Sequence, residues 1–183
     1  MDVIKLIEKY YGPDSKAYYF LVHHSKLVAH KALQVAGRLK ELAPDLKFIE
    51  EAAMLHDIGI FMTHDPKIGC YGSHPYISHG YLGRELLEKE GLPLHALVCE
   101  RHVGVGLTRT DIENNKLPLP ARDMLPVTLE EKIICFADKF YSKEEHSLTA
   151  EKPVGKIRAL VLNFGEDKVK VFDEWLILFK EHE

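Results

Sequence analysis

Apolar residues recur along this chain at the spacing of amphipathic helices. The clearest case runs from about residue 17 to residue 42, where apolar positions three and four residues apart form one stripe. Similar patterns predict further helices at about 2–11, 46–58, 75–90, 94–103, 108–115, 128–142, 154–164 and 167–181. No stretch alternates apolar and polar residues over the length of a strand. The pattern therefore predicts an all-α fold.

Glycine and proline positions refine this prediction. The stretches 60–73 and 116–126 contain several of these residues and lack a helical period, so we expect loops there. Gly59 is expected to end the helix at 46–58, because glycine commonly follows the last helical turn. Gly83 lies inside a predicted helix, where the missing side chain would let another backbone approach closely.

One apolar run ends in two adjacent polar residues, His56 and Asp57. Helical spacing places His56 on the same face as Ile49 and Ala52, and Asp57 lies one position further round. A carboxylate on a buried face is costly unless it is paired or bound to a cation. A neutral imidazole and a carboxylate that bind the same metal ion meet this requirement.

Further polar side chains also fall on helix faces that are otherwise used for packing. They are His24, His79, His102 and Asp138. Each one alone is more often an ordinary core residue than a ligand. Together with His56 and Asp57 they make four imidazoles and two carboxylates, which a helical core does not ordinarily collect. Nitrogen and oxygen ligands without thiolate suit Fe, Mn, Zn, Co or Ni, with Mg at the carboxylate end.

The composition indicates one well-cored domain without a strong charge. The chain has 183 residues, of which 46% are hydrophobic, and a formal net charge of −4. Because no long basic run occurs, we expect no nucleic-acid partner. The three cysteines, Cys70, Cys99 and Cys135, form no CxxC pair and are expected to be buried free thiols.

The sequence also bears on location. No stretch approaches the roughly 20 consecutive apolar residues of a membrane span, and the opening residues lack the pattern of a signal peptide. We therefore expect a cytoplasmic protein with no membrane partner.

The ordered pattern H…HD…D resembles that of the HD-domain metal-dependent phosphohydrolases. Three segments carry the resemblance: His24-Ser25-Lys26-Leu27-Val28, Leu55-His56-Asp57-Ile58-Gly59 and Ala137-Asp138-Lys139. The second of them is similar to the HDIG subclass. The resemblance implies an all-α, HD-domain/PDEase-like helical bundle. It implies one HD domain over 1–183, with a metal-site core at about 17–142 and C-terminal helices at 153–182 packed on it.

Two further segments resemble the branches of this family that hold two metals. They are His79-Gly80-Tyr81-Leu82-Gly83 and Arg101-His102-Val103-Gly104. The resemblance implies one or two divalent ions (Fe, Mn, Zn, Ni, Co or Mg). One would be held by His24, His56, Asp57 and Asp138, and Asp57 would bridge to a second one held by His79 and His102. His74 is an alternative to His79, which we favour for its apolar face.

The function implied by the resemblance is hydrolysis of a phosphomonoester, phosphodiester or phosphoanhydride bond of a nucleotide by a metal-activated water. The catalytic candidates are Asp57, His79 and His102, and the candidates for binding substrate phosphate are Lys139, Arg101, Lys67 and Arg84. The expected partner is a small phosphorylated molecule, and the resemblance leaves a homodimer open.

The sequence departs from the family pattern at two points, and two alternatives to a phosphohydrolase stay open. Ile60 stands where many HDIG proteins have Lys or Arg, and no Gly-Tyr-Pro motif occurs, which disfavours cyclic-di-GMP as the substrate. One alternative is a non-catalytic nucleotide-binding regulatory HD module. The other is a helical scaffold with chance histidines, which predicts no bound metal.

Overall fold

Helices form almost all the regular structure of the computed structural model, which describes residues 1–143 and 149–181. The helices are α1 (Val3–Glu8), α2 (Lys16–Gly37), α3 (Leu46–Leu55), α4 (His79–Lys89), α5 (Pro93–Arg101), α6 (Arg109–Asn114), α7 (Leu129–Asp138), α8 (Val154–Leu162) and α9 (Glu166–Leu178). The strands β1 (His64–Asp65) and β2 (Cys70–Tyr71) form a small antiparallel hairpin. The all-α prediction is confirmed.

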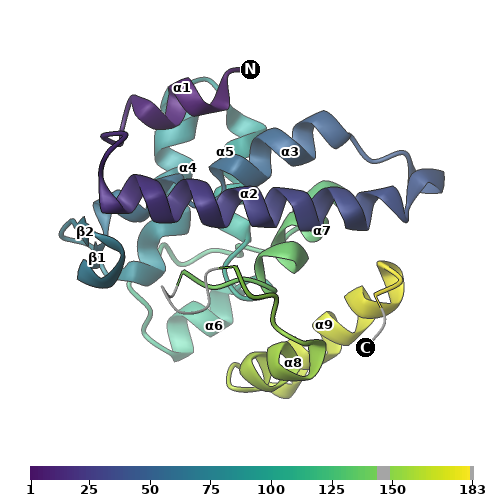
Figure 1. The fold of residues 1–183 in the computed structure, drawn as a ribbon. Helices are drawn as coiled ribbons and strands as arrows, with labels where there is room; N and C mark the ends of the chain where they lie inside the picture. Colours follow the sequence, from purple (N-terminus) through teal and green to yellow (C-terminus); the bar gives the residue numbers. More distant parts are fainter. Residues whose placement is uncertain (144–148, 182–183) are drawn as a thin grey trace.

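The long helix α2 is the element around which the other helices pack. It spans 22 residues and contacts both α3 and α7, while α4 packs against α5. In Figure 1, α8 and α9 lie together below α7, on the side of α2 opposite to α1. Large apolar side chains from these helices, among them Phe20, Ile49 and Phe136, are almost fully buried in the core.

Side-chain caps explain where several helices begin. Ser15 precedes α2 and its hydroxyl accepts a hydrogen bond from the Tyr18 amide over 3.1 Å. Asp45 caps α3 in the same way, with 2.9 Å between its carboxylate and the Phe48 amide. Thr128 caps α7. These caps satisfy amide groups that have no partner inside the helix.

The prediction for Gly59 is wrong in both position and role. Helix α3 ends at Leu55, and Gly59 lies in a following 3-10 turn over Ile58–Met62. A Cβ atom added to Gly59 would lie 2.2 Å from the carbonyl oxygen of His79 and 2.6 Å from the amide nitrogen of Gly83. Gly59 is therefore required by close packing of this turn on α4. The close backbone approach expected at Gly83 is confirmed by the same contact.

Other boundaries differ from the sequence pattern by a few residues. The helix predicted to reach residue 42 ends at Gly37, and a separate 3-10 turn follows over Lys40–Leu42. The helix predicted from residue 75 begins at His79, after a 3-10 turn over Tyr76–Ser78. The predicted loop 60–73 contains the β1–β2 hairpin, whose strands are too short to show alternation.

A buried lysine on α2 forms ion pairs with two glutamates from the C-terminal part of the chain. Lys31 is 4% exposed and its ammonium lies 2.7 Å from carboxylate oxygens of both Glu151 and Glu181. It also lies 4.1 Å from the centre of the Phe140 ring. The assignment of the whole chain to one domain stays a prediction.

Two further expectations concern the cysteines and the membrane. The three cysteines are buried and unpaired, as expected. Within residues 1–143 and 149–181, no helix combines the length and the apolarity that a membrane crossing requires.

Candidate metal centre

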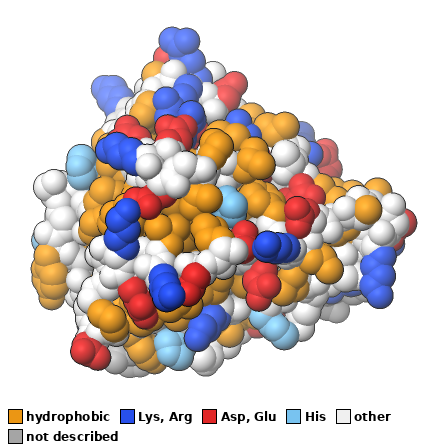
Figure 2. Space-filling view, turned by 90° about the horizontal axis from the view of Figure 1, so that it is seen from above, with side chains coloured by type: hydrophobic (Ala, Val, Ile, Leu, Met, Phe, Trp, Pro, Cys, Tyr) orange, Lys and Arg blue, Asp and Glu red, His pale blue; other side chains and the backbone are white. Residues whose placement is uncertain are grey.

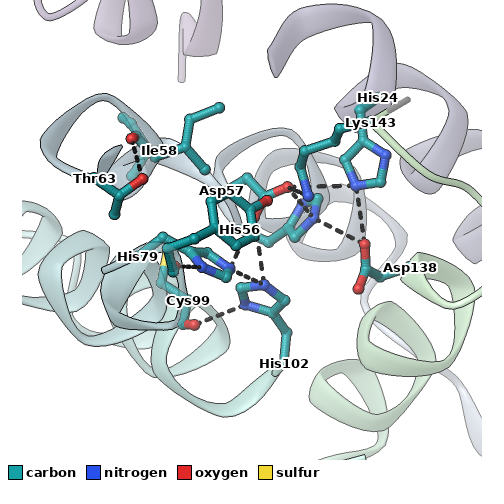
Figure 3. A network of polar contacts seen from close by, with 12 residues as sticks. His24, His56, Asp57, Ile58, Thr63, His79, Cys99, His102, Asp138 and Lys143 are labelled. Atoms are coloured by element: carbon teal, nitrogen blue, oxygen red, sulfur yellow. Dashed lines mark hydrogen bonds and ion pairs between the residues drawn. The ribbon is translucent and has the colours of Figure 1, made fainter. Parts of the chain in front are cut away.

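The structure brings the six side chains singled out by the sequence into one buried cluster. Figure 3 shows them pointing toward one another from different segments of the chain. They form two groups that share one member: His24, His56, Asp57 and Asp138, and then Asp57, His79 and His102. Within each group, the potential ligand atoms all lie within 4.8 Å of one another.

Helix ends position most of this cluster. His56 and His102 are the residues that follow α3 and α5, and His79 is the first residue of α4. Asp57 begins the turn that leads away from α3. His24 alone lies in the middle of a helix, on the buried face of α2. Because a chain changes direction at a helix end, side chains there can point into a shared space between several helices.

The first group places two imidazoles against two carboxylates. The Nε2 atom of His24 lies 2.9 Å from Oδ1 of Asp138 and 3.3 Å from Oδ2 of Asp57. The Nε2 atom of His56 lies 3.1 Å from the same oxygen of Asp57 and 3.4 Å from Oδ1 of Asp138. Two nitrogen and two oxygen atoms therefore surround one point.

The second group meets the other oxygen of Asp57. Its Oδ1 atom lies 3.2 Å from Nε2 of His79 and 3.5 Å from Nε2 of His102. Asp57 thus presents one oxygen to each group. This is the arrangement of a carboxylate that bridges two cation sites.

Backbone carbonyls fix the orientation of three histidines. The Nδ1 atoms of His56, His79 and His102 each lie 2.7 Å from a carbonyl oxygen three residues earlier in the chain. These carbonyls belong to Ala53, Tyr76 and Cys99. Because a carbonyl only accepts, each Nδ1 carries the proton, and a neutral ring then presents the lone pair of Nε2 to the centre. Such outer hydrogen bonds are typical of metal-binding histidines.

Several polar atoms in the cluster need a cation. The Nε2 atoms of His79 and His102 lie 3.0 Å apart, so in neutral rings bonded through Nδ1 two lone pairs face each other. Among the described residues, Nε2 of His56 and Oδ1 of Asp57 are buried without a hydrogen-bond partner. A divalent ion in each group would resolve both problems. The residues present therefore fit metal ions with nitrogen and oxygen ligands.

The pKa values of His24 and His102 in the metal-free protein also favour metal binding. Burial lowers the pKa of both His24 and His102 to about 4, which keeps these rings neutral and able to bind metal. Burial also acts to lower the pKa of His56, but the charges of Asp57 and Asp138 outweigh it and raise that pKa to about 9. Without metal, one imidazolium therefore balances part of the carboxylate charge.

Sequence reasoning missed one charged residue at this centre. The ammonium of Lys143 lies 2.5 Å from Oδ2 of Asp57 and 5.8 Å from the centre of the Tyr76 ring. Burial opposes the charge, yet Asp57 outweighs it and raises the pKa of Lys143. Lys143 lies beyond the end of α7, where no helical period indicates which way a side chain points. The only signal available was its distance of a few residues from Asp138.

A cavity of about 660 Å³ adjoins the cluster. His79, Asp138 and Lys139 contribute to its wall, so it connects directly with the candidate ligands. The ammonium of Lys139 lies 2.8 Å from Oδ2 of Asp138 and 3.1 Å from the carbonyl oxygen of His102. Of the predicted phosphate-binding residues, Lys139 is therefore placed where a substrate could reach it.

The other three predicted phosphate-binding residues lie outside the cavity wall. Arg84 forms ion pairs with Glu88 and with the buried Glu100, and Lys67 is exposed on a short 3-10 turn. Arg101 lies 2.9 Å from a carboxylate oxygen of its partner Glu131. Contact of these three with substrate stays a prediction.

His74 is exposed and belongs to neither ligand group, whereas His79 belongs to the second one. The backbone of His74 instead bonds to the turn at 62–64. The structure therefore places His79, rather than His74, beside Asp57.

Comparison with known proteins agrees with this geometry. A family model described as HD domain matches residues 21–142, about two thirds of the chain. The chain belongs to the HD domain family. The matched segment contains all six side chains of the cluster, and the family's fold is the helical one described above.

Archaeal proteins are among the relatives of this HD domain. An uncharacterized protein of Methanocaldococcus jannaschii is 36% identical over 121 residues, which cover 64% of each chain. Two proteins named tRNA (cytidine(56)-2′-O)-methyltransferase also match. The one from Picrophilus torridus is 34% identical over 61% of this chain and 29% of its own length. The one from Thermoplasma volcanium is 26% identical over 94% of this chain and 45% of its own length.

The matches thus span less than two thirds of each relative's length. No solved structure shows a significant match to this chain.

Proposed function

We propose that this HD domain is a metal-dependent phosphohydrolase that cleaves a phosphoester or phosphoanhydride bond of a nucleotide. The observation that carries the proposal is the shared carboxylate of Asp57, which presents one buried oxygen to each of two ligand groups. Two cation sites joined by a carboxylate are suited to phosphoryl transfer, in which charge develops on both the attacking and the leaving oxygen.

A divalent cation would supply a Lewis acid that activates water at neutral pH and offsets charge on phosphoryl oxygens. The chain supplies the remaining elements. Asp57 and the histidines of the two groups would hold the ions, and backbone carbonyls keep the rings in place. Lys139 offers a positive charge to a phosphate at the cavity wall. The cluster itself is buried, which strengthens each of these electrostatic interactions.

The finer assignment to the HDIG subclass is part of this proposal. It is supported by the residues 55–59, which carry the His-Asp-Ile-Gly sequence, and by the tight packing that Gly59 permits. Ile60 departs from the Lys or Arg of many such proteins, and its side chain is buried. A phosphate contact from position 60 is therefore not part of the proposal.

Methyl transfer is not assigned to this chain. The methyltransferase name belongs to proteins in which the match covers 29% and 45% of the length. More than half of each of those proteins lies outside the region similar to this HD domain. The cluster of histidines and aspartates, in contrast, supports a hydrolytic role, because its nitrogen and oxygen atoms could hold metal ions of the kind that activate water.

The proposed partner is a small phosphorylated molecule, and the proposed location is the cytoplasm. On the face shown in Figure 2, acidic and basic side chains are interspersed, with hydrophobic side chains between them. This mixture agrees with the net charge of −4 and gives this face no broad basic surface of the kind that binds nucleic acid.

Phosphate release tests the proposal. The protein is loaded with Mn²⁺ or Fe²⁺ and offered mononucleotides and, with a coupling phosphatase, cyclic nucleotides and dinucleoside polyphosphates. We expect release that is abolished by a chelator and by Asp57→Asn, but retained by Asp14→Asn, which changes an exposed aspartate. Metal-loaded protein that releases phosphate from none of these would instead support the regulatory nucleotide-binding module.

A further inference from the structure

The cavity beside the metal centre is lined by charged residues next to the metal ligands and mainly by apolar residues elsewhere. Its charged residues at the metal end are Asp138, Lys139 and Lys152. The ammonium of Lys152 lies 2.5 Å from the carbonyl oxygen of Tyr141 and 3.1 Å from that of Lys139. The two lysines therefore place positive charge close to the candidate ligands, where one phosphoryl group would lie.

The rest of the wall is largely apolar. The segment that follows α5 and the helix α8 with the residues after it provide these side chains: Val103, Val105, Leu107, Ile157, Leu160, Val161 and Phe164. Helix α8 lies outside the residues 21–142 that match the HD domain model. The α8 side of this wall therefore lies outside the part that carries the metal ligands, and the side that follows α5 lies within it.

Two charged residues away from the metal ligands neutralise each other. The ammonium of Lys168 is 2.5 Å from a carboxylate oxygen of Asp111, and the lysine is 6% exposed. Both residues line the cavity. Among the described lining residues, Lys168 is the positive charge of this part, and the carboxylate of Asp111 already offsets it, whereas Lys152 at the metal end bonds to carbonyl oxygens. A polyphosphate chain placed beside Lys168 would have to compete with Asp111 and would lose hydration.

Two apolar side chains of this wall are not fully packed by protein. Leu160 is 45% exposed and Phe164 is 66% exposed, although both line the cavity. An apolar group in the cavity would cover part of this surface and gain free energy in proportion to the area removed from water. A cavity of about 660 Å³ is large enough for a phosphoryl group together with a group of ring size.

We propose that the substrate carries a single phosphoryl group at the metal centre and an apolar, ring-sized organic group against α8. The inference rests on the proposed phosphohydrolase function and narrows its substrate class. Among nucleotides it favours mononucleotides, whose planar base can pack on this wall. It disfavours dinucleoside polyphosphates, whose phosphate chain would extend along the apolar part of the cavity.

Binding of phosphonates tests the inference without requiring turnover. Titration calorimetry of the Mn²⁺-loaded protein compares benzylphosphonate with 2-hydroxyethylphosphonate, which has the same charged group and a small polar substituent. We expect benzylphosphonate to bind about tenfold more tightly, the size of effect that apolar pockets produce. Equal affinities, or no binding of either compound, would overturn the inference.

Two variants on α8 test whether the preference for benzylphosphonate arises at this wall. Leu160→Gln should remove most of the preference for benzylphosphonate while leaving the affinity for 2-hydroxyethylphosphonate within about twofold. Leu162→Gln is the matched control, because Leu162 is 54% exposed on the same helix but does not line this cavity. Retention of the preference in Leu160→Gln, or its loss in Leu162→Gln, would contradict the assignment of the apolar group to this wall.

Measurements of hydrolysis distinguish a failure of this inference from a failure of the proposed phosphohydrolase function. Selective binding of benzylphosphonate without hydrolysis of any phosphoester would leave the inference standing and remove the phosphohydrolase. Hydrolysis of diadenosine tetraphosphate in preference to mononucleotides and phenyl phosphate would have the opposite result. It would support the hydrolase and overturn the single-phosphoryl substrate.

Discussion

The ammonium of Lys143 lies 2.5 Å from Oδ2 of Asp57, the carboxylate oxygen that also faces His24 and His56. The position that would hold a cation for the first ligand group is thus approached by a cation of the chain itself. A lysine and a divalent ion cannot both lie this close to one oxygen without strong repulsion. Metal binding should therefore displace Lys143 from Asp57.

Lys143→Met should raise the affinity for divalent cations and lower the stability of the metal-free protein. The affinity rises because a competing ammonium is removed. The stability falls because Asp57 loses its partner, and breaking a buried ion pair costs about 3–5 kcal/mol. Urea unfolding with and without Mn²⁺ measures both effects, and Lys156→Met at an exposed position is the control. Unchanged stability of the metal-free variant would show that this ion pair does not hold Asp57.

Asp57→Asn should reduce metal binding at both groups together, because one carboxylate serves both. The amide has nearly the same volume, so the helices should be kept, although loss of the ion pair with Lys143 lowers the stability of the metal-free protein. Elemental analysis gives the metal content and circular dichroism the helical content. Loss of only one metal equivalent would argue against a bridging role.

His79→Ala should lower the metal content by about one equivalent, since only the second group contains this side chain. His74→Ala is the matched control, because His74 is exposed and lies outside both groups. The same elemental analysis distinguishes the two histidines. An unchanged metal content in His79→Ala would indicate a single metal held by the first group.

Removal of metal should lower the free energy of unfolding. A ligand that binds only the native state stabilises it by about 2.7 kcal/mol when its free concentration is 100 times the dissociation constant. Thermal unfolding before and after chelation, followed by addition of Mn²⁺, measures the change. A melting temperature that does not respond to chelator or to Mn²⁺ would contradict metal binding and favour the helical scaffold.

Gly59→Ala should destabilise the protein and weaken the second ligand group. The added Cβ would lie 2.2 Å from the carbonyl oxygen of His79, so the turn and α4 must move apart. Overpacking of this kind costs about 1–3 kcal/mol. Gly155→Ala on α8 is the control, because its Cβ would meet no atom within 4 Å and alanine favours the helix. Urea unfolding that ranks the two variants equally would contradict the close approach.

Much of the candidate site follows from local properties of the chain. The inward direction of His24 depends only on its place in the apolar stripe of one helix, so sequence periodicity is enough to find it. The same holds for His79, whereas Asp138 lies away from the main stripe of its helix and was expected to be buried because that helix is apolar on more than one side. The end of α3 was harder to predict, because Gly59 is selected by a contact with α4 rather than by the helix that precedes it.

The sequence by itself determined the helical class, the six inward polar side chains and their order, because helical periodicity links each position to a buried or an exposed face. Only the tertiary structure decided that Asp57 presents one oxygen to each group, that Lys143 reaches it, and that α8 supplies an apolar wall. These relationships join residues from different helices and from beyond a helix end. Distances between such residues depend on how the helices pack, and no local pattern records them.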